Sequence, residues 1–553
     1  MVVQELHAIQ EKFGYIPETE LYALSQKLNI PVYELHGVAT FYPGYRMTPP
    51  PRVDIHVCGD FPCRLRGSQQ LKSRIEGITA GVDGVHVGHV SCLGHCDGAP
   101  AITLNHHTHA RKPVDDLLNM IKAAATGQLP KHQHFEGLKG PFVSDPYPTA
   151  AERYGAVRDL IKTGDSAGVI AKLKAAGLRG MGGAGFPTGT KWEAVKGAPG
   201  DEKYIVCNAD ECEVGTFKDR EIMKNVPWLL VEGMILAALV TGAKRGFIYI
   251  RHEYHEQIDA CREEIKRAEA LGLCGDNILG SGKKYKLEVF VSPGGYIQGE
   301  ESALLEAIEG KRGQPRIKPP FPVFVGLWGK PTIINNVETL AYVPPILVKG
   351  ADWWKAQGKN NCTGLKWIGV SGHVNKPGVF EVPMGTTYRE AFAMAGGIEG
   401  NKTLRAFAPS GPSGGFLPAN MIDLSMDFKI MADAGSMLGS GAIVAITEGT
   451  CLLDLALNAT RFFRNESCGK CVPCRVGSQK MVDIIYNMTQ GRGTDDDYGI
   501  IERLSDTLLM TSICGLGQVV PAPIQSTVKY FKDEIDAHAK GQCPSGICKR
   551  KGL

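Results

Sequence analysis

The chain has 553 residues, of which 43% are hydrophobic and 22% are charged, so its composition is that of folded globular domains and excludes a wholly disordered polypeptide. Lys and Arg number 61 against 58 Asp and Glu, and this near balance argues against a dedicated nucleic-acid binder. The length predicts several domains, and the 67 Gly and 16 Cys indicate phosphate-contacting loops and metal ligation rather than a disulfide scaffold.

The N-terminal half predicts two regions and a linker. Residues 1–48 are expected to be helical, because apolar side chains recur at helical spacing. From residue 52, alternating apolar residues predict a half-buried strand, and 85–91 and 100–104 predict further strands, which gives a small α/β domain over 1–126. The segment 127–150 is rich in Gly, Pro, His and Lys without periodicity, so it is predicted to be a linker.

Three further regions follow the linker. A large Gly-rich α/β domain is predicted over 151–348. Short β-type runs around a helix at 388–395 predict a compact β-rich domain over 363–448. Helical periodicity then returns and predicts a helical domain over 451–553 that ends in a basic, exposed tail. The predicted fold class is therefore multidomain α/β.

Neither a signal peptide nor a membrane span is expected from the sequence. The N-terminal residues carry both charges and lack a basic region followed by an apolar core. The most apolar stretch, 228–240, is interrupted by Glu232 and is shorter than a bilayer crossing requires. We therefore expect a cytoplasmic protein with no membrane insertion by this chain and no nucleic-acid partner.

The first of two cysteine constellations follows two predicted strands. Cys58 and Cys63 come after one strand, and Cys92 and Cys96 come after another, so the four thiols can converge on one site. Four Cys suit a [2Fe–2S] cluster. On spacing alone, zinc and unliganded thiols stay open as alternatives.

The second constellation is more compact. Cys468, Cys471 and Cys474 are separated by two residues each in SCGKCVPCR, and Cys514 follows in SICGLG. Three Cys at this spacing fit three corners of a cubane more easily than a single zinc ion, and the remote Cys supplies the fourth ligand. The sequence therefore predicts a [4Fe–4S] cluster, with zinc as the weaker alternative.

Eight further cysteines have no such pattern. Most are expected to be small buried apolar residues. Cys543 and Cys548 offer a metal only two ligands, so we expect them to lie in an exposed tail. The eight are Cys207, Cys212, Cys261, Cys274, Cys362, Cys451, Cys543 and Cys548.

A glycine-rich loop covers residues 177–192. It contains the pattern G-x-G-x-x-G, which marks a dinucleotide site only between a strand and a helix. Here the preceding segment has helical periodicity, and Pro187 with Gly189 is expected to interrupt the following segment, so we reject that fingerprint. We expect instead that backbone amides contact a phosphate, with Arg179 and Lys191 supplying positive charge; a plain Gly-rich turn is the alternative.

Two acidic segments accompany this loop, NADECEVGTFKDR at 208–220 and GGYIQGEE at 294–301. Their carboxylates would repel a phosphate but can accept hydrogen bonds from ribityl or ribose hydroxyls. The alternatives are solvated loops or acids that stabilise a helix N-terminus.

Together these motifs resemble the flavin-bearing, NADH-binding subunit of respiratory complex I, of NAD-linked formate dehydrogenases and of hydrogenases, over about residues 150–548. The first 126 residues resemble the thioredoxin-like [2Fe–2S] subunit that partners it, fused here in one chain. The resemblance implies a β-grasp-like domain over 363–448 and a helical [4Fe–4S] domain beyond it. The motifs that carry it are GVATFY, RGMGGAGFPTGTKW, NADECEVGTFKDR, GGYIQGEE, KPPFP, NNVET and SCGKCVPCR with SICGLG.

The resemblance also implies two nucleotide sites. Glu211 and Glu213 are the expected catalytic residues, and Glu213 is expected to set the preference for NAD over NADP. The NAD(H) site is implied to comprise Phe186, Glu213, Glu301, Lys318 and Phe321, with the aromatic rings stacking on adenine. The FMN site is implied to comprise Gly180, Gly182, Gly183, Lys191, Asn208, Asp210, Glu211, Tyr296, Gly299, Glu300, Asn335, Asn336 and Thr339.

The implied activity follows from electron counting. NAD(H) exchanges two electrons as hydride and iron–sulfur clusters take one at a time, so a flavin must stand between them. This chain departs from complex I proteins at Met181, where Arg is usual, at Val214, where Pro is usual, and at Gln298, where Cys is usual. The apolar Met181 favours the beta subunit of an NAD-dependent formate dehydrogenase, whose partner is a molybdenum- or tungsten-bearing alpha subunit with iron–sulfur clusters.

Two kinds of alternative stay open. The first keeps the enzyme and changes its assembly to complex I, an NAD-reducing hydrogenase or an electron-bifurcating complex. The second is a zinc-stapled scaffold with a degenerate nucleotide pocket and no catalysis.

Overall fold

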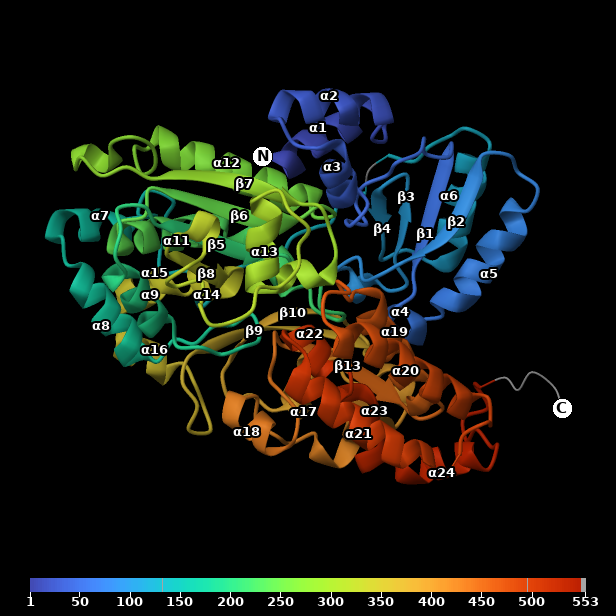
Figure 1. Cartoon of the computed structure of the whole chain (residues 1–553). Coiled ribbons are helices and arrows are strands. Elements are labelled where there is room, and N and C mark those ends of the chain that lie inside the picture. The colour runs from blue at the N-terminus through green and yellow to red at the C-terminus, as the bar shows by residue number, and fades with distance from the viewer. Residues whose placement is uncertain (132, 495, 549–553) are drawn as a thin grey trace.

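The computed structural model describes residues 1–131, 133–494 and 496–548. A four-stranded parallel sheet with the order β7-β6-β5-β8 lies in the largest α/β region (Figure 1). Two of its strands, 204–209 and 245–251, are mostly apolar, as expected where helices cover both faces. The strands are β5 (Tyr204–Ala209), β6 (Arg245–Arg251), β7 (Lys286–Ser292) and β8 (Thr332–Asn336).

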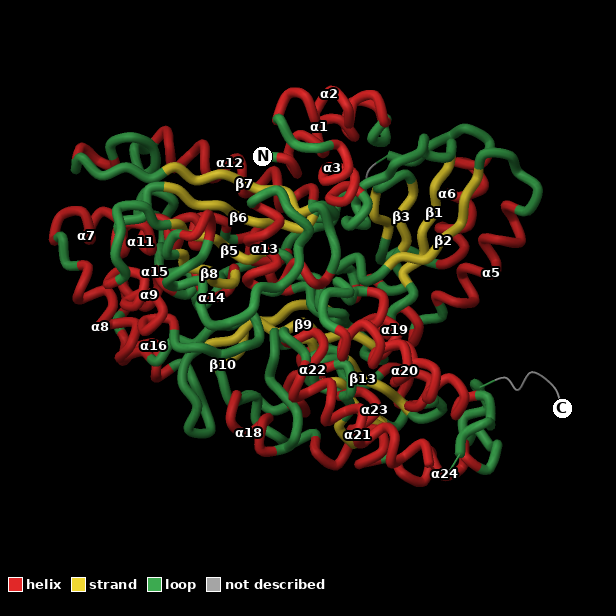
Figure 2. Tube along the Cα trace, viewed as in Figure 1, coloured by secondary structure: helices red, strands yellow, loops and turns green. Residues whose placement is uncertain are grey.

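Helices pack on both faces of this sheet, as the red and yellow segments of Figure 2 show. On one face lies α11, which is buried along nearly its whole length because its sequence is apolar all round. On the other face lies α13. The helices of this region are α7 (Gly155–Thr163), α8 (Ser166–Ala176), α9 (Thr188–Gly197), α10 (Lys218–Asn225), α11 (Pro227–Thr241), α12 (His255–Ala270), α13 (Glu301–Ile308), α14 (Val337–Ala341), α15 (Val343–Lys349) and α16 (Ala351–Ala356).

The N-terminal region divides between two cores. As predicted, it begins with helices, which are α1 (Val2–Phe13), α2 (Glu18–Leu28) and α3 (Val32–Ala39). These helices pack on the α13 face of the large sheet, against Phe247, Tyr249 and Phe290. The three predicted strands and an unpredicted fourth, β4, form a separate sheet in the order β2-β1-β3-β4, whose own core is completed by α5 and α6. Its elements are β1 (Val53–Cys58), α4 (Phe61–Leu65), α5 (Ser68–Thr79), β2 (Val85–Val90), β3 (Ile102–Leu104), β4 (His107–His109) and α6 (Val114–Ala125).

The β-rich region contains a five-stranded mixed sheet in the order β10-β9-β13-β11-β12. The predicted runs and the helix are all present, and the helix begins with a capping box between Thr387 and Glu390. Its elements are β9 (Leu365–Gly372), β10 (Gly378–Pro383), α17 (Tyr388–Met394), β11 (Leu404–Ala408), β12 (Leu417–Pro418), α18 (Phe428–Asp433) and β13 (Ala442–Thr447).

The C-terminal region is helical, as predicted, and lies beside the β-rich sheet (Figure 1). The final part of the predicted basic tail, 549–553, lies outside the described residues. The helices are α19 (Leu452–Asn465), α20 (Val472–Thr489), α21 (Asp496–Thr511), α22 (Gly515–Val519), α23 (Ala522–Tyr530) and α24 (Lys532–Ala539).

The predicted linker has neither helix nor strand in its described residues, 127–131 and 133–150, but it is tied to other regions. The backbone N–H of Val143 donates to Glu381 Oε2 over 2.8 Å. The Tyr147 hydroxyl donates to Glu232 Oε1 over 2.8 Å. The segment therefore fixes neighbouring regions against each other rather than separating them.

Within the described ranges, no single helix is long and apolar enough to cross a bilayer. The pair α10 and α11 meets that test only in combination, and the two helices meet at an angle of 91°.

Candidate active site

The glycine-rich loop connects two helices, α8 and α9. The preceding helix agrees with the prediction and separates this loop from the dinucleotide fingerprint, which needs a strand at that place. The expectation that Pro187 and Gly189 interrupt the following segment is wrong. Pro187 lies directly before α9, a place that suits its fixed φ and missing N–H, and the helix continues through Gly189.

The shape of the loop depends on its glycines. The N–H of Gly180 donates to Phe186 O over 2.9 Å and closes the loop. A Cβ at Gly182 would lie 2.9 Å from Asn336 Cβ, so only glycine allows the loop to approach the end of β8 this closely. Gly183 has φ +135° and open space beside it. The loop thus presents backbone to an open cavity, as a phosphate-contacting loop requires.

The two basic residues of the loop have different roles. The Arg179 guanidinium donates to Gly185 O over 2.6 Å and stacks on the Phe428 ring at 4.6 Å, so it holds the loop and does not face the cavity. This corrects the expectation that Arg179 supplies charge to a phosphate. Lys191 does border the cavity, and its Nζ donates to Ile334 O over 2.9 Å.

Two adjoining cavities open at the carboxyl ends of β5 and β8, where open parallel sheets bind ligands. The larger has a volume of about 750 Å³ and the smaller about 350 Å³. The larger is a size that holds a small-molecule cofactor. Both are bordered by Gly182, Gly183, Ala184, Asn208, Gly299, Glu300 and Asn336.

The structure brings together the residues that the resemblance singled out. Thr339 is the exception: it is fully buried behind the glycine loop, and its Oγ1 accepts a hydrogen bond from the Met181 N–H over 2.8 Å. The smaller cavity alone is bordered by Asp210, Glu211, Glu213 and Tyr296. The larger alone is bordered by Gly180, Phe186, Lys191, Glu301, Lys318, Phe321 and Asn335.

Charge and aromatic surface meet in the larger cavity. Lys318 Nζ donates to Glu300 Oε1 over 2.8 Å and to Glu301 Oε1 over 2.7 Å. Burial alone would lower the pKa of Lys318, but the two carboxylates raise it above its ordinary value. Phe186 and Phe321 are 51% and 50% exposed, so their rings are available to a flat ligand.

The acids of the smaller cavity are buried, and burial raises the pKa of Asp210 and of Glu211 to about 7. The Glu211 carboxylate accepts hydrogen bonds from the N–H of Asp219 over 2.8 Å and of Arg220 over 3.1 Å, in the first turn of α10. Glu213 Oε1 accepts from the Ser413 hydroxyl over 2.7 Å, which links the cavity to the β-rich region. Glu211 therefore positions α10, in line with the helix N-terminus alternative.

A buried charge network behind the smaller cavity was not predicted. Lys218 Nζ lies 2.9 Å from Glu338 Oε2 and 2.5 Å from Asp219 Oδ1, and Asp219 borders the cavity. Lys366 Nζ donates to the same Glu338 oxygen over 2.6 Å, and burial lowers the pKa of Lys366 to about 8. Lys366 lies within an apolar strand, and nothing in its sequence surroundings marks it as a partner of Glu338.

The first four cysteines lie on segments that follow the neighbouring strands β1 and β2. Cys58 ends β1, Cys63 lies in α4, and Cys92 and Cys96 follow β2. All four are at most 4% exposed, and the Sγ atoms of Cys92 and Cys96 are 3.4 Å apart. A dry set of four thiols on neighbouring loops fits a [2Fe–2S] cluster.

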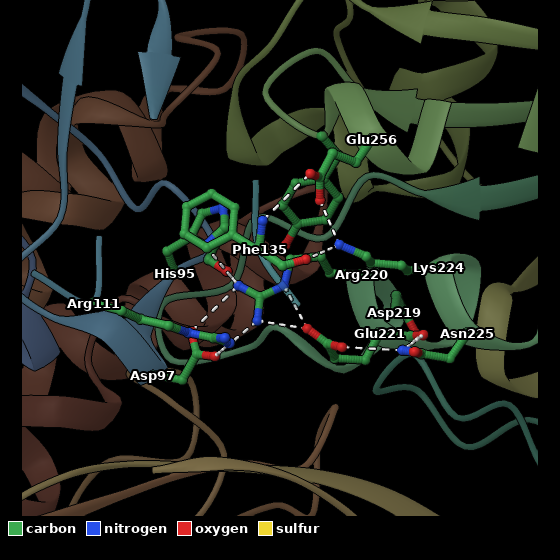
Figure 3. A network of polar contacts seen from close by, with 12 residues as sticks. His95, Asp97, Arg111, Phe135, Asp219, Arg220, Glu221, Lys224, Asn225 and Glu256 are labelled. Carbon is green, nitrogen blue, oxygen red and sulfur yellow. Dashed lines mark hydrogen bonds and ion pairs between the residues drawn. The ribbon is translucent and has the colours of Figure 1, made fainter. Parts of the chain in front are cut away.

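A polar network around Arg220 lies beside this cysteine site, and Figure 3 shows its contacts with Asp97 and Glu221. The buried Arg220 guanidinium donates to Asp97 Oδ2 over 2.9 Å, to Gly94 O over 2.6 Å and to Glu221 Oε1 over 2.8 Å. Arg251 donates to both Cys92 O, over 2.7 Å, and Glu211 O, over 2.6 Å. The segment 211–220 thus lies between the cavity and the first cysteine site.

Three of the second four cysteines lie at helix starts, and Cys468 lies in the loop between α19 and α20. Cys471 directly precedes α20, Cys474 is in its first turn, and Cys514 directly precedes α22. A Cβ at Gly517 would lie 3.0 Å from Cys474 Cβ, so the two segments are side by side. Residues 515, 516 and 519 of α22 border the smaller cavity. This cysteine site is therefore continuous with the cavity wall.

One expectation about the remaining cysteines is wrong. Cys543 and Cys548 are half-buried, and they lie with Cys451 and His538 in a compact group. The prediction counted only the two ligands that are close in sequence. Folding adds one ligand from the start of α19 and one from the end of α24.

Comparison with known proteins agrees with this arrangement. Residues 1–125 match the thioredoxin-like [2Fe-2S] ferredoxin family, and 173–345 match the Nuo51 FMN-binding domain. Residues 368–417 match the SLBB domain, and 454–538 match the iron-sulfur binding region of NADH-ubiquinone oxidoreductase-F.

Relatives match over most of their length. The HndC component of the NADP-reducing hydrogenase of Solidesulfovibrio fructosivorans is 41% identical over 414 residues, which cover 74% of this chain and 84% of the relative. The F component of the NADH-quinone oxidoreductase of Mycobacterium tuberculosis is 42% identical over 381 residues, which cover 68% and 86%. A chain from the crystal structure of air-oxidised NAD+-reducing [NiFe]-hydrogenase is 31% identical, with a TM-score of 0.85 over 97% of this chain and 93% of that chain.

Fold and site together define an oxidoreductase with an FMN-binding domain, a thioredoxin-like [2Fe–2S] domain and a [4Fe–4S] region, as predicted. The chain belongs to the family of NADH dehydrogenase subunits that includes HndC and the F component of NADH-quinone oxidoreductase. The matched cofactor domains exclude the zinc-stapled scaffold as a description of the whole chain.

Proposed function

We propose that this chain exchanges electrons between NAD(H) and a partner subunit of a multisubunit redox complex. The observation that carries the proposal is the smaller cavity, which has the glycine loop on one side and residues 515–519, directly after Cys514, on the other. FMN, when bound, takes up hydride and releases electrons singly. A flavin in this cavity would lie beside the proposed [4Fe–4S] ligands.

The residues of the glycine loop fit FMN. The backbone at Gly182 and Gly183 borders both cavities without side chains, and Lys191 is the basic residue at the adjoining larger cavity. Thr339 holds the loop through the Met181 N–H. Asn208 and Glu300 border both cavities and are placed to form hydrogen bonds with ribityl hydroxyls. The Glu300 carboxylate can accept them, and the Asn208 amide can accept or donate.

The larger cavity fits NAD(H). The exposed rings of Phe186 and Phe321 offer a stacking surface to adenine. Lys318, held between Glu300 and Glu301, is a cation for the pyrophosphate, and the two acids keep it in place. Glu213 borders the smaller cavity and lies apart from Phe186 and Phe321. Its effect on the choice between NAD and NADP therefore acts through the electrostatic field rather than through contact.

Two kinds of redox complex are candidates for the assembly that contains this chain. The sequence favours the alpha subunit of an NAD-dependent formate dehydrogenase because of the apolar Met181. That side chain is 3% exposed and packs in the core, so it acts on loop packing. The likeness over nearly the whole chain to an NAD+-reducing hydrogenase chain favours a hydrogenase-type assembly as the second candidate. Mass spectrometry of the intact purified complex identifies the partner and decides between them.

The nucleotide part of the proposal is tested by Phe321→Ala. Loss of one stacking ring should raise the KM for NADH about fivefold, because an aromatic contact of this kind contributes about 1 kcal/mol. Flavin content should stay at the wild-type level. The control is Ile317→Ala, an apolar residue that is 70% exposed and borders neither cavity. An unchanged KM in F321A, or an equal rise in both variants, would reject the assignment.

A further inference from the structure

Four potential metal ligands meet in the C-terminal region, apart from both sites described above. Cys451 caps the start of α19, His538 lies in the last turn of α24, and Cys543 and Cys548 follow that helix. One ligand atom from each lies within 4.8 Å of the other three. Cys451 Sγ is 3.6 Å from Cys548 Sγ and 3.5 Å from His538 Nε2.

These separations are those of ligands around a single ion. Zinc binds sulfur at about 2.3 Å and nitrogen at about 2.05 Å. In a tetrahedral site, two sulfur ligands are then about 3.8 Å apart, and a sulfur and a nitrogen ligand are about 3.5 Å apart. An iron–sulfur cluster instead spreads its ligands over different iron atoms, so its four ligand atoms do not converge on one point. The donor set of three thiols and one imidazole is a common structural zinc set.

The histidine is already oriented for such a role. His538 Nδ1 lies 2.7 Å from Glu534 O, a carbonyl that can only accept a hydrogen bond, so the proton is on Nδ1. In the neutral ring the lone pair of Nε2 is then available to a metal, and Nε2 faces the Cys451 thiol. The Asp454 N–H donates to Cys451 Sγ over 3.3 Å, a contact that favours a thiolate.

We propose that Cys451, His538, Cys543 and Cys548 bind one zinc ion in a closed, structural site. Four protein ligands complete a tetrahedron and leave no position for substrate, so the ion has no catalytic step. The site fastens residues 540–548 to the start of α19.

The position of the proposed zinc site indicates what it stabilises. Helix α19 contacts the first cysteine site through Asp454, whose two oxygens each accept a hydrogen bond of 2.8 Å from Arg64, next to Cys63. Asn458 of the same helix donates to Gly59 O over 2.9 Å. By fixing the start of α19, the ion stabilises the contact between the C-terminal helices and the thioredoxin-like domain.

The test uses full-length protein produced with both iron and zinc available and purified without chelators. Metal analysis should give about one zinc per chain in the wild type and below about 0.1 in Cys543→Ser and His538→Gln. The iron content should stay at about six atoms per chain, the sum for one [2Fe–2S] and one [4Fe–4S] cluster. The control is Cys362→Ser, which changes a half-buried thiol outside the group and should keep its zinc.

Zinc K-edge X-ray absorption of the wild type supplies a second measurement that needs no variant and is blind to iron and flavin. It should show three sulfurs at about 2.3 Å and one nitrogen at about 2.0–2.1 Å. A wild type without zinc, iron in its place, retention of zinc by soluble C543S, or a shell of oxygen ligands would each overturn the proposal. If the variants fail to fold, the wild-type spectrum decides.

Discussion

The two cysteine sites flank the smaller cavity but differ in burial and in access to it. Cys58, Cys63, Cys92 and Cys96 are at most 4% exposed, and the segment 211–220 separates them from the cavity. In the other site, Cys468 and Cys471 are half-buried, and the helix after Cys514 forms part of the cavity wall. The difference teaches that one site is open to both cavity and surface, as an exit for electrons must be, whereas the other is enclosed.

The largest effect is expected from Cys471→Ser. Loss of a proposed [4Fe–4S] ligand should lower reduction of the partner subunit by NADH at least about a hundredfold, because the exit cluster is removed. NADH-dependent ferricyanide reduction, which needs only the flavin, should persist near the wild-type rate. Steady-state assays of the intact complex check this. Partner reduction at the wild-type rate would show that electrons leave elsewhere.

Cys92→Ser tests the role of the enclosed cysteine site. It should remove about two iron atoms per chain and leave about four, as the two cluster types require. Because the first site is off the direct route, partner reduction should fall less than about threefold. Iron analysis and the same assay decide. A loss as large as that of C471S would place both clusters on one obligatory path.

Glu213→Gln examines the cavity between the two sites. Removing the charge while keeping the size should improve the NADPH:NADH specificity ratio about three- to tenfold, since a 2′-phosphate then meets less repulsion. The effect is moderate because Glu213 lies apart from Phe186 and Phe321. Steady-state kinetics with both nucleotides measure it. An unchanged ratio with intact flavin content would move the selectivity to Glu301.

The smallest effect concerns Glu232, which borders neither cavity. Burial in α11 raises its pKa to about 7, although the Tyr147 hydroxyl donates to it. The unfolded chain has the lower pKa, so this group's contribution is present below about pH 4.5 and is lost as pH rises through about 7.

Wild-type Tm should therefore fall between pH 5.5 and 8, and Glu232→Gln should reduce that fall by a few °C. The exposed Glu263 on α12 provides the matched control, Glu263→Gln, which should follow the wild type. Equal pH dependence in all three proteins would contradict the assignment. The result separates pH effects on folding from those on electron transfer.

The sequence predicted those features whose residues are close along the chain. The glycine loop, the acidic segments and the compact cysteine run each have a local pattern, because backbone shape and ligand spacing are local constraints. Long-range partners had no such signal. Cys451 and His538 join Cys543 and Cys548 only through the packing of α19 and α24, and Lys366 reaches Glu338 only because two regions pack together.

The same reasoning applies to the fold. Periodicity predicted the N-terminal helices and the strand that follows them at 53–58. It could not show that the helices pack on the larger sheet while the strand belongs to the smaller one. Likewise, the rule that proline interrupts a helix does not distinguish the middle of a helix from its start, where Pro187 lies.

The central claim is that NAD(H) exchanges electrons with the clusters through FMN in the cavity beside Cys514. The most direct measurement is the electron paramagnetic resonance spectrum of purified protein after anaerobic addition of NADH, with and without prior removal of FMN. The account predicts the signal of a reduced [4Fe–4S] cluster in the flavin-containing protein, its loss after FMN removal and its return when FMN is restored. Cluster reduction by NADH without FMN, or none with FMN present, would contradict the account.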